Sequence, residues 1–470
     1  MSSTLLSRAP IQSPARRTGI GMALVLVAQL MLVLDATVVN VALPHIAGDL
    51  GFGPAALSWV LNAYSLAFGG LLLLGGRLGD VLGRLRFFWT GLAVFTLFSF
   101  VGGLAVDPAM LVASRALQGV GAAMAAPSVL ALLTTNAPTE AARNRALAAF
   151  TAVSSGGGAL GLILGGVLTD VLSWRWTLFI NVPIGLTVLL LVRRYVSETE
   201  RRHGSFDIVG ALSATGGAVA LVWTLIKVPG WGWTSDRTIV GLAVAAALIA
   251  TLVVTERRHP HPLLRPALLR NRQRVAALGT MAAMYGAMLA MFFLMVQFLE
   301  EQLGFGPLQA GLAFLPMPVS VFAMSRVAPR LVARFGPAPL IITGAAGMTL
   351  SFWHLTAIDA GSHYWWGAMP SLFLTGLSGG ISFMPITALV LRDVEPEHAG
   401  SASGLLQTMQ QLGGAVGFAI VTSVFAAHET GSFVTGAHAG FTAADSLAAT
   451  ALASALTLLV RRRASYSMME

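Results

Sequence analysis

The sequence predicts an all-α integral membrane protein that crosses the bilayer fourteen times. Three observations lead to this fold class: the composition, the number and length of the apolar runs, and an internal repeat. Of the 470 residues, 56% are hydrophobic and only 10% are charged, which is far from the composition of a soluble globular domain. The formal charge of +9 does not indicate a nucleic acid partner, because the basic residues concentrate in the termini and in alternate connections between apolar runs, as in membrane proteins.

Fourteen apolar runs are long enough to cross a bilayer, which takes about 20 residues in a helix. The first six lie at about 19–44, 56–76, 86–105, 109–134, 144–169 and 173–193. Two shorter runs follow at about 206–226 and 237–255, and then six more at about 273–299, 308–328, 338–357, 364–391, 399–427 and 442–460. Because the number of crossings is even and basic residues mark the cytoplasmic side, we expect a multi-pass protein of the cell membrane with both termini in the cytoplasm.

The first six and the last six runs repeat one unit. A shift of 256 positions carries Gly157-Gly-Ala-Leu-Gly161 onto Gly413-Gly-Ala-Val-Gly417, and the same shift superposes the first five runs of each set. Transporters with such repeats place the substrate site near the bilayer midplane, between the halves. We therefore expect an N-terminal six-helix bundle at 1–200, a two-helix insertion with cytoplasmic connections at 201–272, and a C-terminal six-helix bundle at 273–470.

One acidic residue, Asp35, lies inside the first apolar run. An ionised carboxylate at the centre of a membrane helix costs about 2.5–3.5 kcal/mol on insertion scales, and removal from water favours the protonated form. We therefore interpret Asp35 as a proton-binding site that faces a cavity. The alternative is an Asp that is permanently paired or bound to water and only holds helices together. Pro44 lacks an amide hydrogen, so we expect it to close this first span.

Four stretches together carry a resemblance to a known family. They are Leu34–Pro44 in the first run, Gly76–Arg86 after the second, Arg115–Gly121 in the fourth and Gly157–Gly166 in the fifth. Through them the chain resembles the major facilitator superfamily, and within it the fourteen-span drug:proton antiporters. The resemblance covers nearly the whole length. It implies a major facilitator fold of two six-helix bundles related by a pseudo-twofold axis, with two inserted helices, and transport by alternating access.

By this resemblance, Asp35 and Arg115 are the residues of proton coupling. At about 1.5 Å per residue, Asp35 lies roughly 13 Å inward from Pro44 and Arg115 roughly 9 Å inward from Ala109, so the two occupy a similar layer. We predict that Asp35 alternates between a contact with Arg115, direct or through water, and a neutral protonated state. The alternative is a static buried pair, which would contribute little net stability.

The connection after the second run resembles the signature loop of the superfamily, which gates the cytoplasmic side. In this interpretation Asp80 lies against the positive N-terminal end of the helix that begins near Gly400. That contact would hold the cytoplasmic side closed while the outer side is open. The alternative is a solvated basic turn that serves topology only. The matching residues are Gly76, Asp80, Gly83, Arg84 and Arg86.

The glycines of the fifth run resemble an antiporter motif that packs helices. Small residues at this spacing let two membrane helices approach closely. Leu162 stands where the motif has a Pro, so the helix lacks a position at which it could kink. The usual link of this motif to exchange, rather than to co-transport, is therefore weaker here. The matching residues are Gly157, Gly161, Gly165 and Gly166.

A stripe of methionines offers the best clue to the substrate. Met281, Met284, Met288, Met291 and Met295 recur every three or four positions, so they share one face of the helix expected at 273–299. Methionine is flexible and suits varied apolar ligands, so a stripe that faces the cavity predicts a lipophilic substrate. The other interpretation, which we favour slightly, is ordinary helix packing. Polar candidates for the same cavity are Asn62, Gln118, Gln297, Gln407 and Gln411.

Other polar groups indicate no further site. Glu300 and Glu301 end the methionine-bearing run at the outer face, where they draw cations to the mouth or, as we favour, are simply solvated. His259-Pro-His-Pro262 offers too few ligands for a metal. The chain has no Cys, no phosphate-binding loop and no cluster of His and acidic residues at helical spacing, so a membrane-embedded enzyme is the least favoured class.

We therefore expect a secondary active transporter that exports lipophilic or amphipathic compounds, such as drugs or antibiotics, in exchange for protons. This function would be multidrug efflux linked to antibiotic resistance. The expected partners are the small-molecule substrate, protons and membrane lipid, without nucleic acid, and the protein is expected to act as a monomer. The proton gradient would supply the energy, with no cofactor or metal. The alternative within transport is proton-linked or passive uptake of a small metabolite, which Leu162 and the few acidic residues would favour.

Overall fold

A computed structural model describes residues 14–137, 139–199, 208–258, 266–359, 361–392, 394, 399–429 and 432–459. In these residues every regular element is a helix, which confirms the all-α prediction. Twelve helices are long and apolar enough to cross a membrane, and two further spans, each bent at a short break, bring the number to fourteen. The bends are 52° between Trp59–Leu72 and Leu74–Leu82, and 41° between Arg145–Gly158 and Leu160–Val171.

The first half of the chain forms six of these spans and one short helix. They are α1 (Pro14–Leu50), the short α2 (Pro54–Leu57), α3 (Trp59–Leu82), α4 (Arg84–Gly103), α5 (Pro108–Thr135), α6 (Glu140–Val171), and α7 (Trp176–Phe179) followed by α8 (Asn181–Tyr195). Each span agrees with an apolar run of the sequence.

The insertion and the second half supply the other eight spans. The insertion forms α9 (Ile208–Trp231) and α10 (Asp236–Arg258). The second half forms the 3₁₀ helix η1 (Pro266–Arg270), α11 (Arg272–Gln297), the π-helix η2 (Phe298–Gln302), α12 (Pro307–Ala313), α13 (Pro316–Phe335), α14 (Pro337–Leu355), the π-helix η3 (Tyr364–Ala368), α15 (Met369–Leu391), α16 (Ala399–His428) and α17 (Phe433–Leu456).

The first helix differs from the prediction at its end. Helix α1 continues through Pro44 to Leu50, so the prediction that Pro44 closes the span is wrong. A proline inside a helix removes one backbone hydrogen bond, but membrane helices tolerate it because neighbouring groups satisfy the freed carbonyl. The added turns carry His45 and Asp49 on the same helix as Asp35.

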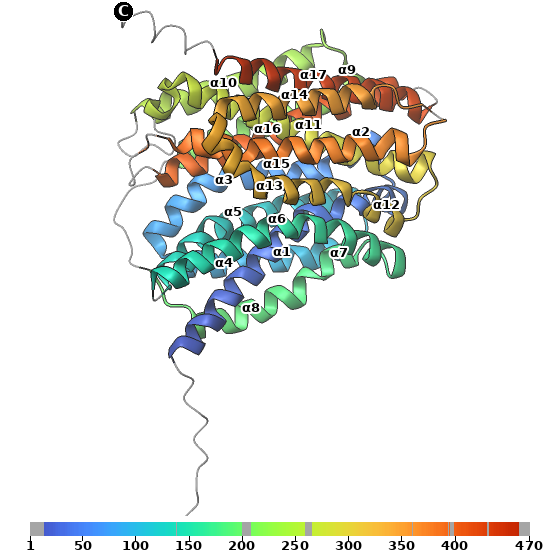
Figure 1. Cartoon of the computed structure of the whole chain (residues 1–470). Helices are drawn as coiled ribbons and strands as arrows, with labels where there is room; N and C mark the ends of the chain where they lie inside the picture. The colour runs from blue at the N-terminus through green and yellow to red at the C-terminus, as the bar shows by residue number, and fades with distance from the viewer. Residues whose placement is uncertain are drawn as a thin grey trace, which may run out of the picture.

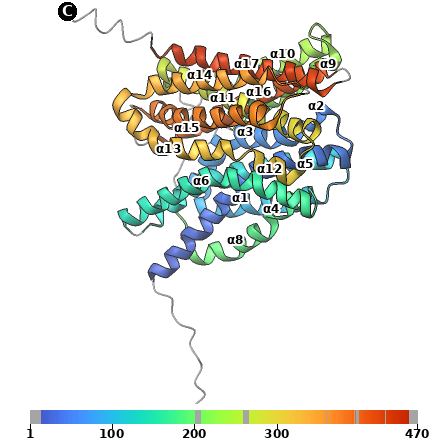
Figure 2. The ribbon, with the colours of Figure 1, turned by 45° about the vertical axis from the view of Figure 1, so that its right-hand side comes forward.

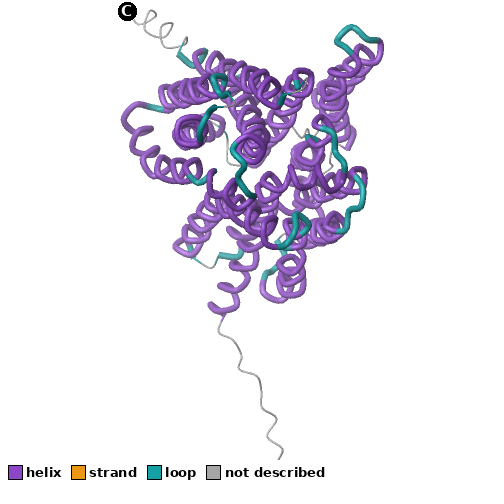
Figure 3. Tube along the Cα trace, turned by 90° about the vertical axis from the view of Figure 1, so that its right-hand side faces the viewer, coloured by secondary structure: helices purple, strands orange, loops and turns teal. Residues whose placement is uncertain are grey.

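The helices run side by side between two ends that differ in charge (Figure 1). At one end lie Arg84 at the start of α4, Arg193 and Arg194 in the last turn of α8, and Arg272 at the start of α11. We call it the basic end. The opposite end contains Leu50 at the close of α1, together with α2, α7 and α12, and lies to the right in Figure 1. We call it the far end, and Figure 3 views the bundle from it.

The two halves of the chain occupy two parts of the bundle. Figures 1 and 2 show α1, α4, α6 and α8 of the first half, in blue and green, below α14, α15 and α17 of the second half, in orange and red. The exact boundaries at residues 200 and 272 stay a prediction, in part because 200–207 and 259–265 lie outside the described residues.

One hydrophobic cluster joins both halves. It contains Val41 and Ile46 of α1 together with Phe292 of α11 and Phe314 after α12, all at most 7% exposed. Its members from the first half all lie in the far-end portions of their helices. A second cluster, which includes Phe88, belongs to the first half alone. The halves therefore share their buried apolar contact toward the far end.

The inserted helix α9 covers the seam at which α3 of the first half meets α16 of the second. Its residues Val222 and Ile226 share a hydrophobic cluster with Leu66 of α3 and Ala419 of α16. Helix α10 packs on α9. Because α9 contacts one helix from each half, the insertion stabilises their contact from the outside of the bundle.

The variant Gly70→Ala tests this packing. A Cβ at Gly70 of α3 would lie 2.5 Å from Oγ1 and 2.9 Å from Cβ of Thr215 on α9. Overpacking costs about 1–3 kcal/mol, so we expect the melting temperature of the purified protein to fall. The matched control is Gly156→Ala on α6, where a Cβ would have no atom within 4 Å. Equal melting temperatures for the two variants would contradict the close contact of α3 with α9.

Candidate functional site

Asp35 is completely buried in α1 and accepts hydrogen bonds on both carboxylate oxygens. Its side chain is 0% exposed. Nη1 of Arg115 donates to Oδ2 across 2.6 Å, while Nδ2 of Asn181 and Nε2 of Gln118 donate to Oδ1 across 2.8 and 3.3 Å. The donors belong to α5 and α8, so the carboxylate connects three helices of the first half. The contact that the sequence predicts between Asp35 and Arg115 is therefore present, and it is direct.

Arg115 is almost as deeply buried, with 1% of its side chain exposed. Its Nε donates to the carbonyl oxygen of Val60 on α3 across 3.1 Å, and its Nη1 also donates to Oε1 of Gln118 across 3.0 Å. The guanidinium carbon lies 4.4 Å from the centre of the Tyr64 ring, which is a cation–π distance. These partners would keep binding the guanidinium if its contact with Asp35 were lost.

The hydrogen-bond pattern fits an ionised carboxylate opposite a charged guanidinium. An ionised carboxylate only accepts hydrogen bonds, whereas a protonated one must donate one. Three donors point at Asp35, from Arg115, Gln118 and Asn181. Protonation of Asp35 would remove one charge of a buried pair and change which of these bonds can form. The arrangement can therefore respond to the binding of a single proton.

Three residues of the network are missing from the sites that the sequence predicts: Asn181, Ser99 and Tyr64. Oγ of Ser99 on α4 accepts a hydrogen bond from Nε2 of Gln118 across 2.6 Å. One signal could have identified Asn181, because a polar side chain in a membrane span usually faces the interior of the bundle. No pattern in the sequence distinguishes Ser99 or Tyr64 from other polar residues of the spans.

Asp35 does not face an open cavity in this conformation. Its complete burial means that water does not reach the carboxylate, contrary to the expectation of a cavity-facing acid. The physical reason is that Arg115, Gln118 and Asn181 surround both oxygens and take the place of water. Both oxygens of Asp35 are therefore shielded from water in this conformation.

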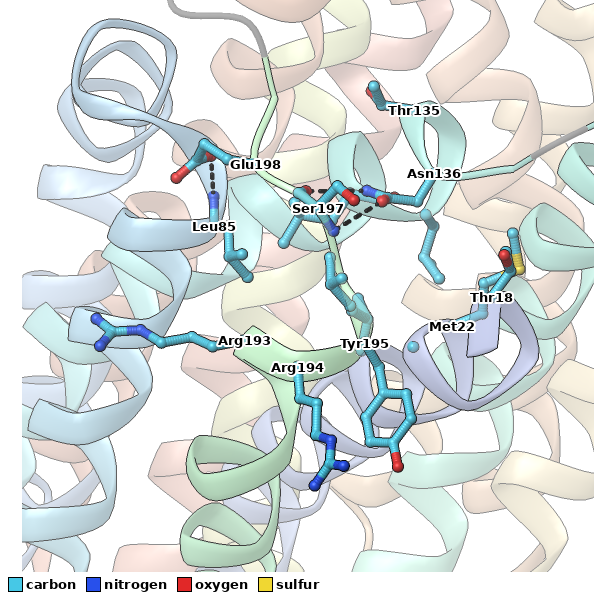
Figure 4. Close-up of a pocket in the computed structure, with 15 residues that line it drawn as sticks. Thr18, Met22, Leu85, Thr135, Asn136, Arg193, Arg194, Tyr195, Ser197 and Glu198 are labelled. Atoms are coloured by element: carbon cyan, nitrogen blue, oxygen red, sulfur yellow. Dashed lines mark hydrogen bonds between the residues drawn. The ribbon is translucent and has the colours of Figure 1, made fainter. Parts of the chain in front are cut away.

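A cavity of 810 Å³ lies elsewhere, at the basic end of the first half (Figure 4). It is bounded by the start of α1, the end of α5 and the residues that follow α8, and its lining includes Thr18, Leu85, Asn136, Arg194 and Glu198. None of the residues that the sequence predicts for the substrate cavity lines it. This cavity is therefore distinct from the Asp35 network.

The methionine stripe packs inside the protein in this conformation. Met284, Met291 and Met295 are 0% exposed and belong to the hydrophobic cluster shared by both halves, and Met288 is partly buried against it. This is the ordinary helix packing that the sequence slightly favours over a stripe that faces the cavity. Of the predicted polar residues nearby, Gln297 donates to the carbonyl oxygen of Phe293 in its own helix across 3.1 Å, and Gln407 is exposed.

Two other predicted cavity residues lie on α3 and α16, the helices that meet at the seam. Asn62 of α3 is 1% exposed, and neither its amide nitrogen nor its amide oxygen has a hydrogen-bond partner among the described residues. Gln411 of α16 packs so closely on α3 that a Cβ at Gly69 would lie 2.5 Å from the Cβ of Gln411. A buried amide without partners costs about 1–3 kcal/mol, so Asn62 is suited to bind water or a polar group of a substrate.

The predicted gating loop forms a compact turn between α3 and α4. Gly83 has φ of +107°, a conformation that L side chains rarely adopt. Asp80 binds Arg84 of the same loop across 2.6 Å, and Nη1 of Arg84 donates to the carbonyl oxygen of Pro127 on α5 across 3.3 Å. Gly76 also lies against Pro127, and Arg86 is exposed. The contact of Asp80 with the start of α16 involves residues only partly described, and it stays a prediction.

Glu198 completes this loop, although the sequence gives it no role. Its Oε1 accepts from the backbone N–H of Leu85 across 2.7 Å (Figure 4). Its Oε2 accepts from the backbone N–H of Arg86 across 3.1 Å. Both amides belong to the first turn of α4, whose free N–H groups attract a negative charge. Asn136, at the end of α5, exchanges two hydrogen bonds with the backbone of Ser197. The segment after α8 thus fastens the basic ends of α4 and α5.

The glycines of the predicted packing motif do bring helices together. Gly157 and Gly161 face side chains of α1, and a Cβ at Gly165 would collide with the carbonyl oxygen of Val38 in α1. Gly166 turns to the other half of the molecule, where a Cβ would lie 2.6 Å from the carbonyl oxygen of Pro307 at the start of α12. One short stretch of α6 therefore packs against both halves.

The described residues contain no group of three His, Cys, Asp or Glu side chains that could hold a metal ion. The sequence His259-Pro-His-Pro262 lies outside the described residues.

Comparison with known proteins agrees with this architecture. Residues 25–418 match the family described as Major Facilitator Superfamily. The chain is 38% identical to the puromycin resistance protein pur8 of Streptomyces alboniger, over 90% of this chain and 85% of that protein. It is 40% identical to the cephamycin export protein CmcT of Amycolatopsis lactamdurans, over 86% of this chain and 84% of that protein.

Solved structures add evidence for the fold alone. The crystal structure of the POT family transporter PepTSo superposes with a TM-score of 0.70 at 13% sequence identity, and the match covers 98% of this chain and 99% of that one. This likeness confirms the fold class that the sequence predicts.

Removing one partner of the buried pair is expected to destabilise the protein more than removing both charges. Arg115→Leu leaves the carboxylate uncompensated, which costs about 3–5 kcal/mol, whereas Arg115→Leu combined with Asp35→Asn leaves neither charge. We therefore expect the melting temperature of purified Arg115→Leu protein to fall and that of the double variant to recover in part. Additive losses in the double variant would show that the two residues do not interact.

Proposed function

Since the chain belongs to the major facilitator superfamily, we propose that it exports lipophilic or amphipathic compounds, of the drug or antibiotic type, in exchange for protons. The observation that carries this proposal is the fully buried carboxylate of Asp35, which is bound on both oxygens and paired with Arg115. The names of the relatives, one for puromycin resistance and one for cephamycin export, support the class of substrate. The proton gradient supplies the energy, and no cofactor or metal takes part.

The proton acts by changing the contacts of α1. Ionised Asp35 holds α1 against α5 and α8 through Arg115, Gln118 and Asn181. When Asp35 is protonated, Arg115 keeps its bonds to Val60 and Gln118 and its contact with Tyr64, but loses its counter-charge. The helices are then free to rearrange, which exposes Asp35 to one side of the membrane and lets it exchange its proton there.

The charge of the two ends supports an orientation. Loops rich in Lys and Arg stay in the cytoplasm, so we place the basic end there, and with it both termini. The far end then faces outward, and the conformation described here is closed on that side by the hydrophobic cluster shared by the halves. Export follows if substrate leaves through the far end, and a proton that enters there is released at the basic end.

The buried surfaces between the halves support an apolar substrate. Ligand sites are mostly apolar with a few polar groups that fix orientation. The partly buried Met288 and the unpartnered amide of Asn62 offer both kinds of surface. Neither carries a charge, which suits a neutral or weakly charged compound better than an anion.

Asp35→Asn is expected to abolish proton-driven export, because Asn neither binds nor releases a proton. The measurement is the accumulation of fluorescent lipophilic dyes, and of puromycin, in a bacterial strain that lacks its own efflux pumps, with and without an uncoupler. The wild type should lower accumulation several-fold, the uncoupler should remove this effect, and Asp35→Asn cells should resemble cells without the protein.

Asp236→Asn is the matched control, because it makes the same chemical change at an exposed residue in the first turn of α10. It should export as the wild type does. Two outcomes contradict the proposal: full uncoupler-sensitive export by Asp35→Asn, or higher accumulation in cells that carry the wild type, which would indicate uptake.

A further inference from the structure

We propose that His45 and Glu300 form a second proton-binding site at the far end, which takes up one proton from outside when the two halves close there. This inference rests on the proposed function and adds a second titrating group to it. The sequence favours simple solvation of Glu300, and the structure contradicts that interpretation.

Glu300 is buried and only partly bound. Its side chain is 9% exposed, its Oε2 lies 3.7 Å from Nδ1 of His45, and its Oε1 is buried without a hydrogen-bond partner among the described residues. The residue lies in the π-helix η2, and π-turns within membrane or soluble helices are frequent at functional sites. A buried carboxylate with a free oxygen is costly in its ionised form, so the closed arrangement favours the presence of a proton.

The pair joins the two halves of the molecule. His45 belongs to α1 of the first half, and Glu300 follows α11 of the second. Close by, Gly166 of α6 lies against Pro307 of α12, so tightly that a Cβ would not fit. The contact of His45 with Glu300 therefore exists when the halves meet at the far end, and it is lost when they separate there.

Further acidic groups lie near Glu300. Glu301 adjoins it, and beyond Glu301 lies Glu429, whose pKa is raised by burial and further by Glu301. His45, which is 44% exposed, is the basic group that faces Glu300 from α1, and α12, which packs against η2, contains no titratable residue. The site thus combines three acidic groups with one imidazole that is open to water.

The sign of the effect follows from the two states. In water, a glutamate titrates at about 4.3, so at pH 7.5 an open far end leaves Glu300 ionised. In the closed state Glu300 is buried with one oxygen unpartnered among the described residues and with His45 beside the other, so we expect the site to hold one proton. Closure therefore binds one proton, and the ratio of closed to open molecules should rise by up to about tenfold for each unit of pH decrease.

This site is separate from Asp35. His45 follows Asp35 by ten positions on α1, which is about 15 Å along a helix. In the proposed function the proton for Asp35 also enters from the far end. The site of His45 and Glu300 therefore takes up its proton on the same side of the membrane. Two protons per cycle, one at each site, are the expected stoichiometry.

The distance between the halves at the far end tests the inference without any substrate. The chain has no Cys, so spin labels can be attached to Val106→Cys in the first half and Trp366→Cys in the second, which are 77% and 81% exposed. Double electron–electron resonance in lipid nanodiscs between pH 5.5 and 8.5 should show a closed population that grows as pH falls. Glu300→Gln, which mimics the protonated acid, should stay closed at every pH.

Three controls keep the result decisive. Glu301→Gln, at the exposed neighbour, should keep the pH dependence, and His45→Gln should weaken it. In an Asp35→Asn background the pH dependence should persist. If Glu300→Gln keeps the wild-type response while Asp35→Asn abolishes it, the second site is overturned and the proposed function stands. If both Glu300→Gln and Asp35→Asn keep the wild-type pH dependence, neither residue controls closure, and the second site is overturned.

Discussion

The buried contact between Asp35 and Arg115 is the interaction on which the account of this protein depends. Both side chains are almost without exposure, and a lone charge at that depth would be several kcal/mol less stable than a pair. The surrounding donors and acceptors from α3, α4, α5 and α8 are arranged so that each charge is satisfied. The first half of the molecule is therefore organised around two buried charges, each of which is stable only when paired with the other. A proton that neutralises Asp35 changes the stability of the hydrogen-bond network around both.

The packing between the two halves allows them to separate and to meet again. Toward the far end, Gly166 and Pro307 let α6 and α12 approach at backbone distance, and a common hydrophobic cluster surrounds them. At the seam of α3 and α16, the inserted helix α9 covers the contact from outside. Small residues and apolar surfaces have no directional bonds to break, so such contacts can separate and form again at low cost, whereas the polar network around Asp35 is specific.

Much of this could be predicted from the sequence. Fourteen apolar runs of bilayer length and a repeat at 256 positions gave the spans and their symmetry, because membrane helices must be long, apolar and continuous. The resemblance to the family implied the pairing of Asp35 with Arg115, and their similar depth in the membrane supported it. The other contacts of the network could be identified only from the structure. Nothing in the sequence shows what Asn181 or Ser99 binds, and only the folded chain brings Asn181 to Asp35 and Ser99 to Gln118. Pro44 was misjudged because a membrane helix can continue through a proline, as α1 does. Glu300 was misjudged because its burial and its contact with His45 of α1 depend on tertiary packing.

The central claim is that the carboxyl group of Asp35 binds and releases a proton. Infrared difference spectroscopy of the purified protein in lipid, between pH 5 and pH 9, measures this directly through the carbonyl stretch of protonated carboxylic acids. We expect a carbonyl band that titrates in the wild type and is missing from the spectrum of Asp35→Asn under the same conditions. An identical set of titrating bands in the two proteins would contradict it.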